Sequence, residues 1–143
     1  MYNFFTSIKL ENDNLIIKGT SHSFGVGFGI NDNVERKLIF ENTTDFSKYE
    51  YDLGSITNGD YVVSLVVSDN LDKTRAWYNK TIDIKALPAG NYVLYIQNKV
   101  NNTSYYGEII DVAYTDFKNI NSNSYQFKRN NDIRLRLELK VNR

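Results

Sequence analysis

The stretch Asp132-Ile133-Arg134-Leu135-Arg136-Leu137-Glu138-Leu139-Lys140-Val141 decides the fold class. Aliphatic residues occupy every second position from Ile133 to Val141, and charged residues fill the positions between them. Because successive side chains of a β-strand point to opposite faces, this period of two predicts a strand with one face in a core and the other in water. The whole stretch is therefore expected to be an amphipathic strand.

Further short runs have the same period, and almost nothing in the sequence predicts helix. Clusters of Asn, Asp and Gly separate the runs and favour tight turns. Many short strands joined by such turns are typical of an all-β sandwich or barrel. We expect one antiparallel sandwich domain spanning residues 1–143, with strands near 4–10, 15–22, 34–41, 49–53, 61–67, 74–84, 92–97, 108–114 and 125–128.

Composition excludes several classes of function. Seventeen basic and seventeen acidic residues cancel, so no net field favours nucleic acid or an anionic membrane. The absence of cysteine excludes disulfides and thiolate metal sites. No apolar run approaches the ~20 residues that a membrane helix needs, so membrane insertion is not expected. Because strand-like sequence begins near Met1, we hypothesise that the chain is a domain of a longer exported protein.

A weak internal repeat supports the sandwich. Asp52-Leu53, Ile56, Gly59 and Tyr61 recur 31 residues later as Asp83-Ile84, Leu87, Gly90 and Tyr92. In each copy an aliphatic residue precedes a glycine turn and then a tyrosine, which predicts a corner whose tyrosine hydroxyl bonds the backbone. The alternative is a chance likeness of two unrelated corners, and both interpretations leave a sandwich.

The glycine-rich run at residues 24–30 does not fit a phosphate-binding loop, because Ile30 stands in place of the last glycine and no helix pattern follows. Its glycines alternate with Phe24, Val26, Phe28 and Ile30, which predicts a strand with one bare face. Either a bulky side chain such as Trp77 or a ligand ring covers that face.

Trp77 is the central candidate for ligand contact. If Ala76, Tyr78, Ile82 and Ile84 face the core, alternation places Trp77 outward together with Arg75 and Asp83. An exposed indole beside a guanidinium and a carboxylate suits sugar binding. The alternative is that a bulge buries Trp77 in the core, or that its ring covers the glycine strip.

Two loops carry further candidates. The Asn-rich segment 98–104 is expected to be an exposed loop that presents Tyr106 for recognition. The segment 68–73 gathers the oxygen ligands Asp69 and Asp72, which fits either a calcium ion or an ordinary solvated turn. Catalysis has little support: His22 lacks a readable triad, and Glu108 and Asp111 are carboxylates of unknown separation.

The segments 72–78, 81–83, 87–92 and 106–108 resemble the immunoglobulin-like repeats of Gram-positive cell-envelope proteins. Such sandwiches accompany wall hydrolases, wall teichoic acid glycosyltransferases and surface proteins of Firmicutes, where they act as carbohydrate-binding or spacing modules. The resemblance implies an immunoglobulin-like β-sandwich at an extracellular or envelope-associated location. It assigns no catalytic residue.

The sequence hypothesis is therefore a non-enzymatic envelope module without cofactor or metal. It binds a cell-wall or surface glycan, with a polysaccharide or wall polymer and neighbouring domains of a parent protein as partners. The alternatives are a spacer or self-association domain and, with least support, a small glycan-cleaving enzyme. The candidate ligand-binding residues are Trp77, Arg75, Asp83 and Tyr106.

Overall fold

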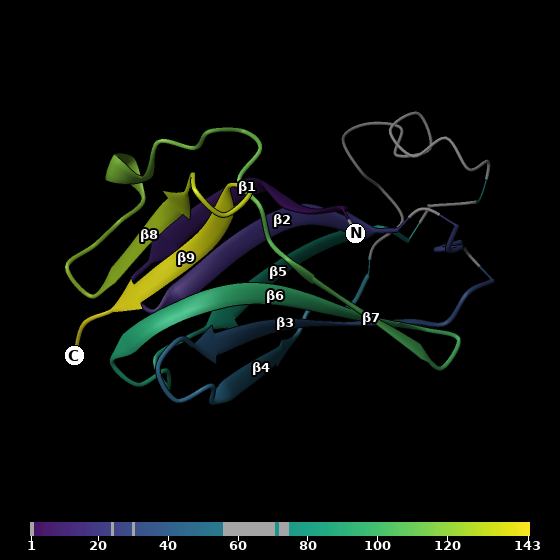
Figure 1. Cartoon of the computed structure of the whole chain (residues 1–143), viewed down its shortest axis with the longest axis horizontal. Coiled ribbons are helices and arrows are strands. Elements are labelled where there is room, and N and C mark those ends of the chain that lie inside the picture. Colours follow the sequence, from purple (N-terminus) through teal and green to yellow (C-terminus); the bar gives the residue numbers. More distant parts are fainter. Residues whose placement is uncertain (1, 24, 30, 56–70, 72–74) are drawn as a thin grey trace.

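The computed structural model describes residues 2–23, 25–29, 31–55, 71 and 75–143. Two antiparallel sheets face each other in this part of the chain, which confirms the predicted all-β sandwich (Figure 1). The three-stranded sheet has the order β1-β2-β5, with β1 (Tyr2–Glu11), β2 (Asn14–His22) and β5 (Trp77–Asp83). The six-stranded sheet has the order β4-β3-β6-β9-β8, and β7 pairs with β6; its strands are β3 (Val34–Asn42), β4 (Lys48–Asp52), β6 (Gly90–Val100), β7 (Thr103–Glu108), β8 (Tyr125–Asn130) and β9 (Arg136–Val141).

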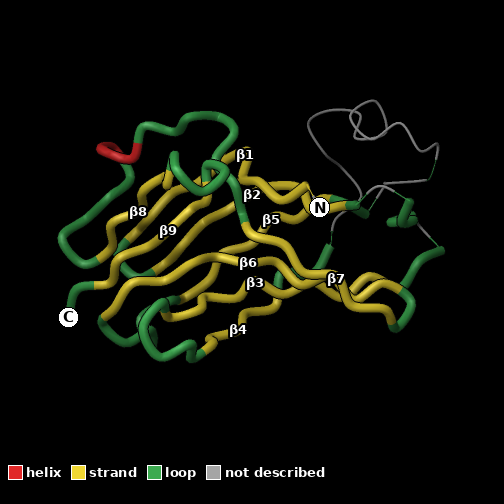
Figure 2. The backbone as a smooth tube through the Cα atoms, in the orientation of Figure 1, coloured by secondary structure: helices red, strands yellow, loops and turns green. Residues whose placement is uncertain are grey.

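The described residues hold a single short helical turn, Phe117–Asn119, in the long loop before β8 (Figure 2). No described helix has the length and apolarity that a membrane crossing requires.

The main core lies between the sheets and follows the predicted alternation. Leu137, Leu139 and Val141 of β9 are buried, and charged residues alternate with them. Their neighbours in this core include Leu15 and Ile17 of β2, Leu38 and Phe40 of β3, and Tyr92, Leu94 and Ile96 of β6.

The strand predicted over residues 132–141 is four residues too long. Arg134 and Leu135 have φ angles of 49° and 60°, in the left-handed region, and β9 begins at Arg136. The Oδ1 atom of Asn130 accepts a hydrogen bond from the amide of Asp132, which turns the chain directly after β8. Ile133 therefore lies in a turn and is 40% exposed, although the hydrophobic period continues through it.

The Asn-rich segment is a tight hairpin and not a long loop. Asn101 and Asn102 have φ angles of 49° and 71°, the backbone that a two-residue hairpin turn needs and that Asn tolerates. Strand β6 therefore continues to Val100, and Asn98 is buried within it. The prediction of a strand over 108–114 is wrong, because β7 occupies Thr103–Glu108 and the chain then leaves the sheet.

The second copy of the repeat forms the predicted corner. The hydroxyl of Tyr92 donates a 2.7 Å hydrogen bond to the carbonyl of Pro88, and Leu87 is buried beneath it. Most of the first copy, together with the strand predicted at 61–67, lies outside the described residues.

The glycine-rich segment is irregular, so the prediction of a strand there is wrong. Gly25 has a φ angle of 78°, and the carboxylate of Asp32 accepts a 2.7 Å hydrogen bond from the amide of Gly29. This local turn replaces pairing with a neighbouring strand. Phe24 and Ile30 lie outside the described residues.

Arg36 on β3 is buried between the sheets, on the same face as Leu38 and Phe40. Its guanidinium donates to five neutral acceptors, and its carbon Cζ lies 5.8 Å from the centre of the Tyr78 ring. Burial lowers the pKa of Arg36 to about 10, so the side chain stays charged at neutral pH. The acceptors, at 2.7 to 3.2 Å, are Asn98 Oδ1 and the carbonyls of Ser21, Gly54, Arg75 and Trp77.

This network extends through other buried polar side chains. The Nδ2 atom of Asn98 donates to the hydroxyl of Ser21 at 2.6 Å, and that hydroxyl donates to the Oδ1 atom of Asn3. Asn3, Ser21 and Asn98 are all buried, so each group depends on these partners.

Replacing Arg36 should destabilise the sandwich strongly. Arg36→Met leaves several buried acceptors without donors, which should lower the free energy of unfolding by at least about 3 kcal/mol. Arg36→Lys should recover little of the lost stability, because an ammonium group with three N–H donors cannot reach the five acceptors that the planar guanidinium reaches. Urea unfolding followed by Trp77 fluorescence measures both. The matched control is Lys37→Met on the exposed face of β3, where an effect within about 0.5 kcal/mol is expected; a similarly small effect for Arg36→Met contradicts the prediction.

Gly19 should not tolerate a side chain. A Cβ atom there would lie 2.6 Å from Cζ of Tyr78, which packs against Gly19 across the β2–β5 pair. Gly19→Ala is expected to cost about 1–3 kcal/mol through overpacking. Thermal unfolding provides the measurement, with Ser104→Ala at an exposed position of β7 as control. Equal midpoints for the two variants contradict this account.

Candidate functional site

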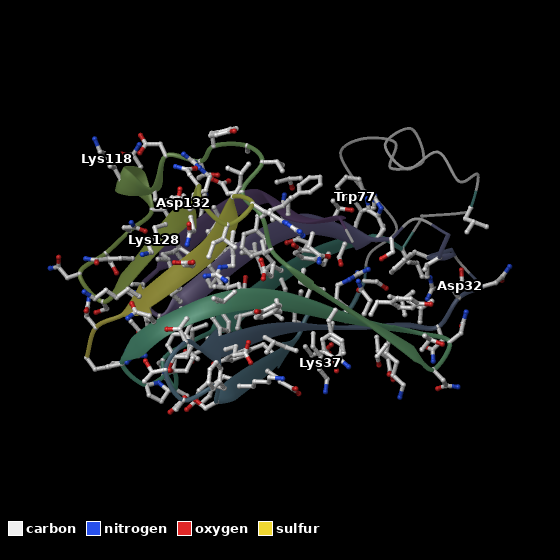
Figure 3. All side chains as sticks on the ribbon, viewed as in Figure 1. Asp32, Lys37, Trp77, Lys118, Lys128 and Asp132 are labelled. Atoms are coloured by element: carbon white, nitrogen blue, oxygen red, sulfur yellow. The ribbon has the colours of Figure 1, made fainter. Side chains whose placement is uncertain are left out.

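The expectation that Trp77 faces solvent is wrong: its side chain is 5% exposed. It belongs to a second buried cluster with Phe28, Ala76 and Val100, against which Tyr105 packs. Its neighbour Tyr78 is buried in the main core. Alternation predicts an exposed side chain only where nothing packs on that face of the strand. At the start of β5, Val26 and Phe28 from the 23–33 loop pack on the face that carries Trp77. No register shift interrupts the β2–β5 pair, so the burial of Trp77 does not come from a bulge. Its cluster includes Phe28 and Val26 of the glycine-rich segment, which agrees with the alternative that its ring covers this segment. Figure 3 shows the side chains of the described residues, with Trp77 labelled.

The other sequence candidates do not join Trp77 in one site. Asp83 is the last residue of β5, about 20 Å along the strand from Trp77. Its half-exposed carboxylate accepts a hydrogen bond from the backbone amide of Lys85 and pairs with the ammonium group of the same residue. The carbonyl of Arg75 accepts a hydrogen bond from Arg36. Tyr106 lies in the other sheet and is 60% exposed, so the expected exposure of this tyrosine is confirmed.

A hollow of about 690 Å³ lies where the six-stranded sheet forks. Strand β6 pairs with β9 through Gly90–Val93 and with β7 through Tyr95–Val100. Because β6 changes partners at this point, β7 and β9 diverge, and an isolated bridge between Ile110 and Arg136 joins their ends. The fork hollow is lined by Tyr95, Tyr106, Gly107, Glu108, Ile110, Ile133 and Arg134.

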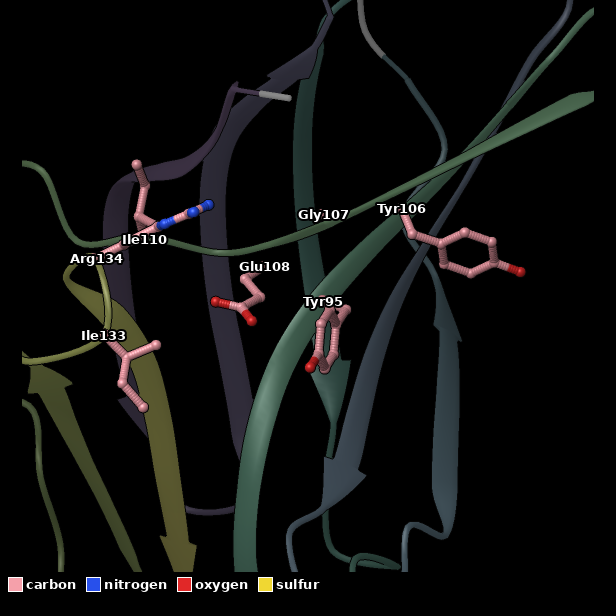
Figure 4. A pocket seen from close by; sticks show the side chains of 7 residues that line it. All are labelled: Tyr95, Tyr106, Gly107, Glu108, Ile110, Ile133 and Arg134. Atoms are coloured by element: carbon pink, nitrogen blue, oxygen red, sulfur yellow. The ribbon is translucent and has the colours of Figure 1, made fainter.

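The lining combines aromatic, aliphatic and charged groups (Figure 4). The Glu108 carboxylate lies between the Tyr95 ring on one side and Ile133 and Arg134 on the other, and Tyr106 extends outward at the rim. Register explains this placement: Tyr95 is opposite Glu108 and Gln97 is opposite Tyr106, so these side chains leave the sheet on the same face.

Burial raises the pKa of the Tyr95 hydroxyl, and the negative charges of Glu108 and then Glu41 raise it further. Tyr95 is therefore a neutral hydrogen-bond donor at physiological pH. The hollow thus offers a phenol, a carboxylate acceptor and a guanidinium donor beside apolar surface.

Asn3 of β1 forms hydrogen bonds to the backbone of Glu108 and Ile110, the segment that forms the floor of the fork hollow. The backbone carbonyl of Asn3 accepts a 3.0 Å hydrogen bond from the amide of Ile110. Its side-chain amide donates to the carbonyl of Glu108 at 3.5 Å. Through Asn3, the Arg36 network reaches the segment that lines the hollow.

The carboxylates raised as a catalytic couple have different surroundings. Asp111 is buried, forms a 3.1 Å ion pair with Arg129 and accepts hydrogen bonds from Thr115. These contacts fix the loop after β7. Glu108 instead faces the fork hollow. Within the described ranges, no three His, Cys, Asp or Glu residues are grouped as a metal site would require; Asp69 and Asp72, considered for calcium, lie outside those ranges.

No family model and no curated protein matches the chain. Among solved structures, the chain is similar to a crystal structure of residues 217–571 of TarS from S. aureus, with a TM-score of 0.59 and 14% sequence identity. The similarity covers 97% of this chain and 38% of the TarS chain. At this identity the likeness shows a shared fold alone.

The burial of Trp77 can be tested by fluorescence, because it is the only tryptophan in the sequence. Iodide should quench the native protein weakly and the urea-unfolded protein strongly, since a charged quencher does not reach a buried ring. A variant with Trp77→Phe and Tyr106→Trp moves the reporter to the rim of the fork hollow and should be quenched strongly while folded. Equal native quenching of the two proteins contradicts the assignment.

Proposed function

We propose that this protein is a non-catalytic accessory module of the Gram-positive cell envelope that binds a wall or surface glycan in the fork hollow. The observation that carries the proposal is the grouping of Tyr95, Tyr106, Glu108 and Arg134 around one solvent-open depression. A sugar ring has apolar C–H faces and polar edges, which fit an aromatic ring and flanking hydrogen-bonding groups respectively.

The relationship to immunoglobulin-like envelope repeats is part of the proposal. The sheet with the strand order β1-β2-β5 faces the sheet that contains β4-β3-β6-β7. The hydrogen-bonded corner of Tyr92 lies at the start of β6, as a tyrosine corner does in sandwiches of the immunoglobulin type. The fold likeness to TarS adds support, because S. aureus is a Gram-positive bacterium. An envelope-associated location follows from the same proposal.

Binding without hydrolysis fits the lining better than glycosidase chemistry. Glycosidases generally use a pair of carboxylates that flank the scissile bond. Glu108 is the carboxylate among the described residues that line the hollow, and Asp111 is held by Arg129.

Edge pairing between copies has less support than glycan binding. The edge strand β4 places Lys48, Glu50 and Asp52 on one face, and β1 is interrupted by an irregularity between Phe5 and Ser7. Charges and bulges of this kind discourage the addition of another strand.

Tyr106→Ala should weaken glycan binding about tenfold, because an aromatic contact of this kind contributes roughly 1 kcal/mol or more. Tyr95→Phe removes only the hydroxyl and should have a smaller effect of the same sign. Calorimetric titration with purified wall polysaccharide and peptidoglycan fractions gives the affinities. Phe46→Ala, an exposed aromatic in the β3–β4 turn, is the matched control and should bind like the parent. The proposal fails if no fraction binds, or if Tyr106→Ala and Phe46→Ala behave alike.

A further inference from the structure

A second hollow, of about 270 Å³, lies beside the first residues of β6. Its lining residues are Thr43, Asn91, Tyr92, Lys128, Glu138, Leu139 and Lys140. Asn91 leaves β6 on the same face as Tyr95, because the two positions are four residues apart in a continuous strand. The two hollows therefore open on one face of the six-stranded sheet, about 13 Å apart along β6.

A row of three exposed polar side chains crosses three adjacent strands, and two of the three, Asn91 and Lys140, line this second hollow. Lys140 of β9 is paired in register with Asn91 of β6 on one side and with Gln126 of β8 on the other. Strands are about 4.8 Å apart, so the three side chains leave the sheet from neighbouring positions within a span of about 10 Å. Such a row offers several N–H donors to one acceptor group.

The neighbouring acidic residue does not neutralise Lys140. Glu138 accepts hydrogen bonds from Arg136 at 2.7 and 3.0 Å and from Asn130 at 3.0 Å, and its other oxygen lies 3.5 Å from Lys128. Burial acts to raise the pKa of Glu138, but these hydrogen bonds and the charges of Arg136 and Lys128 outweigh it and lower that pKa. Glu138 is thus an ionised carboxylate with its own cations.

Lys140 forms no ion pair with any residue in the described part of the chain. With Glu138 balanced by Arg136 and Lys128, the second hollow carries a surplus of positive charge. An anion placed there would face an ammonium without an ion-pair partner and the carboxamide of Asn91.

We propose that the second hollow is a subsite for an acidic group, a carboxylate or a phosphate ester, held by Lys140 and Asn91 of its lining, with Gln126 next to them on β8. This inference rests on the proposed glycan binding and narrows it: the ligand is an acidic glycopolymer whose neutral part occupies the fork hollow while its acidic group reaches Lys140. The separation of about 13 Å requires a ligand of more than one sugar unit.

The test compares ligands that differ in charge. A uronic acid oligosaccharide, a phosphodiester-linked glycopolymer and a neutral glucan of similar length are titrated into the parent protein and into Lys140→Gln at low ionic strength. Lys140→Gln should weaken binding of the acidic ligands about three- to fivefold, as for one exposed ion pair, and leave the neutral glucan unaffected. Added salt should reduce the difference through screening. The order of affinity for the two acidic ligands distinguishes a carboxylate from a phosphate.

The matched control is Lys9→Gln, which removes the same charge from an exposed position on the three-stranded sheet and should bind every ligand like the parent. If Tyr106→Ala weakens binding but Lys140→Gln does not, the acidic subsite is overturned and the proposed function stands. If no glycan binds, the proposed function is overturned. Titration with inorganic phosphate and with glucuronate then decides the subsite alone: amide shifts at Asn91, Gln126 and Lys140 support it, and their absence overturns it.

Discussion

A buried positive charge organises this sandwich. Arg36 extends from β3 into the space between the sheets, and its donors reach Ser21, Arg75 and Trp77 on one side and Gly54 and Asn98 on the other. Because an ion in a low-dielectric interior is tolerated only when its donors are satisfied, these acceptors must keep their positions relative to each other. The guanidinium therefore sets how the two sheets meet at this end of the molecule.

The same constraint reaches the candidate site. Hydrogen bonds run from Arg36 through Asn98 and Ser21 to Asn3, which holds the backbone of Glu108 and Ile110. The floor of the fork hollow is thus tied to a buried polar network, whereas Tyr106 at its rim is exposed. A preformed floor reduces the conformational entropy lost on binding, which favours a ligand that is held by a few contacts, such as a sugar ring.

The two hollows lie along one face of the six-stranded sheet. The fork hollow has aromatic surface beside Glu108 and Arg134, and the second hollow has Lys140 and Asn91 in its lining. Under the two proposals, a glycopolymer with neutral and acidic units contacts both hollows. The fold is similar to that of part of TarS. Because folds of this kind occur in proteins of many functions, the proposed function rests on the side chains of the hollows and not on the fold.

Local pattern was enough to predict most strands of the described residues, the antiparallel sandwich and the corner at Tyr92, because alternation and a hydrogen bond across four residues are properties of short segments. It failed at β7 and in the glycine-rich segment, where turns decide the course of the chain. Alternation also places Arg36 on the inner face with Leu38 and Phe40, but its five acceptors come from distant segments and have no local signal. Tertiary structure alone decided that Trp77 is buried, since residues of the 23–33 loop cover it, and that a hollow opens beside Tyr95. The first depends on how a distant loop packs on β5, and the second on where β6 exchanges β9 for β7, which the sequence of one strand does not specify.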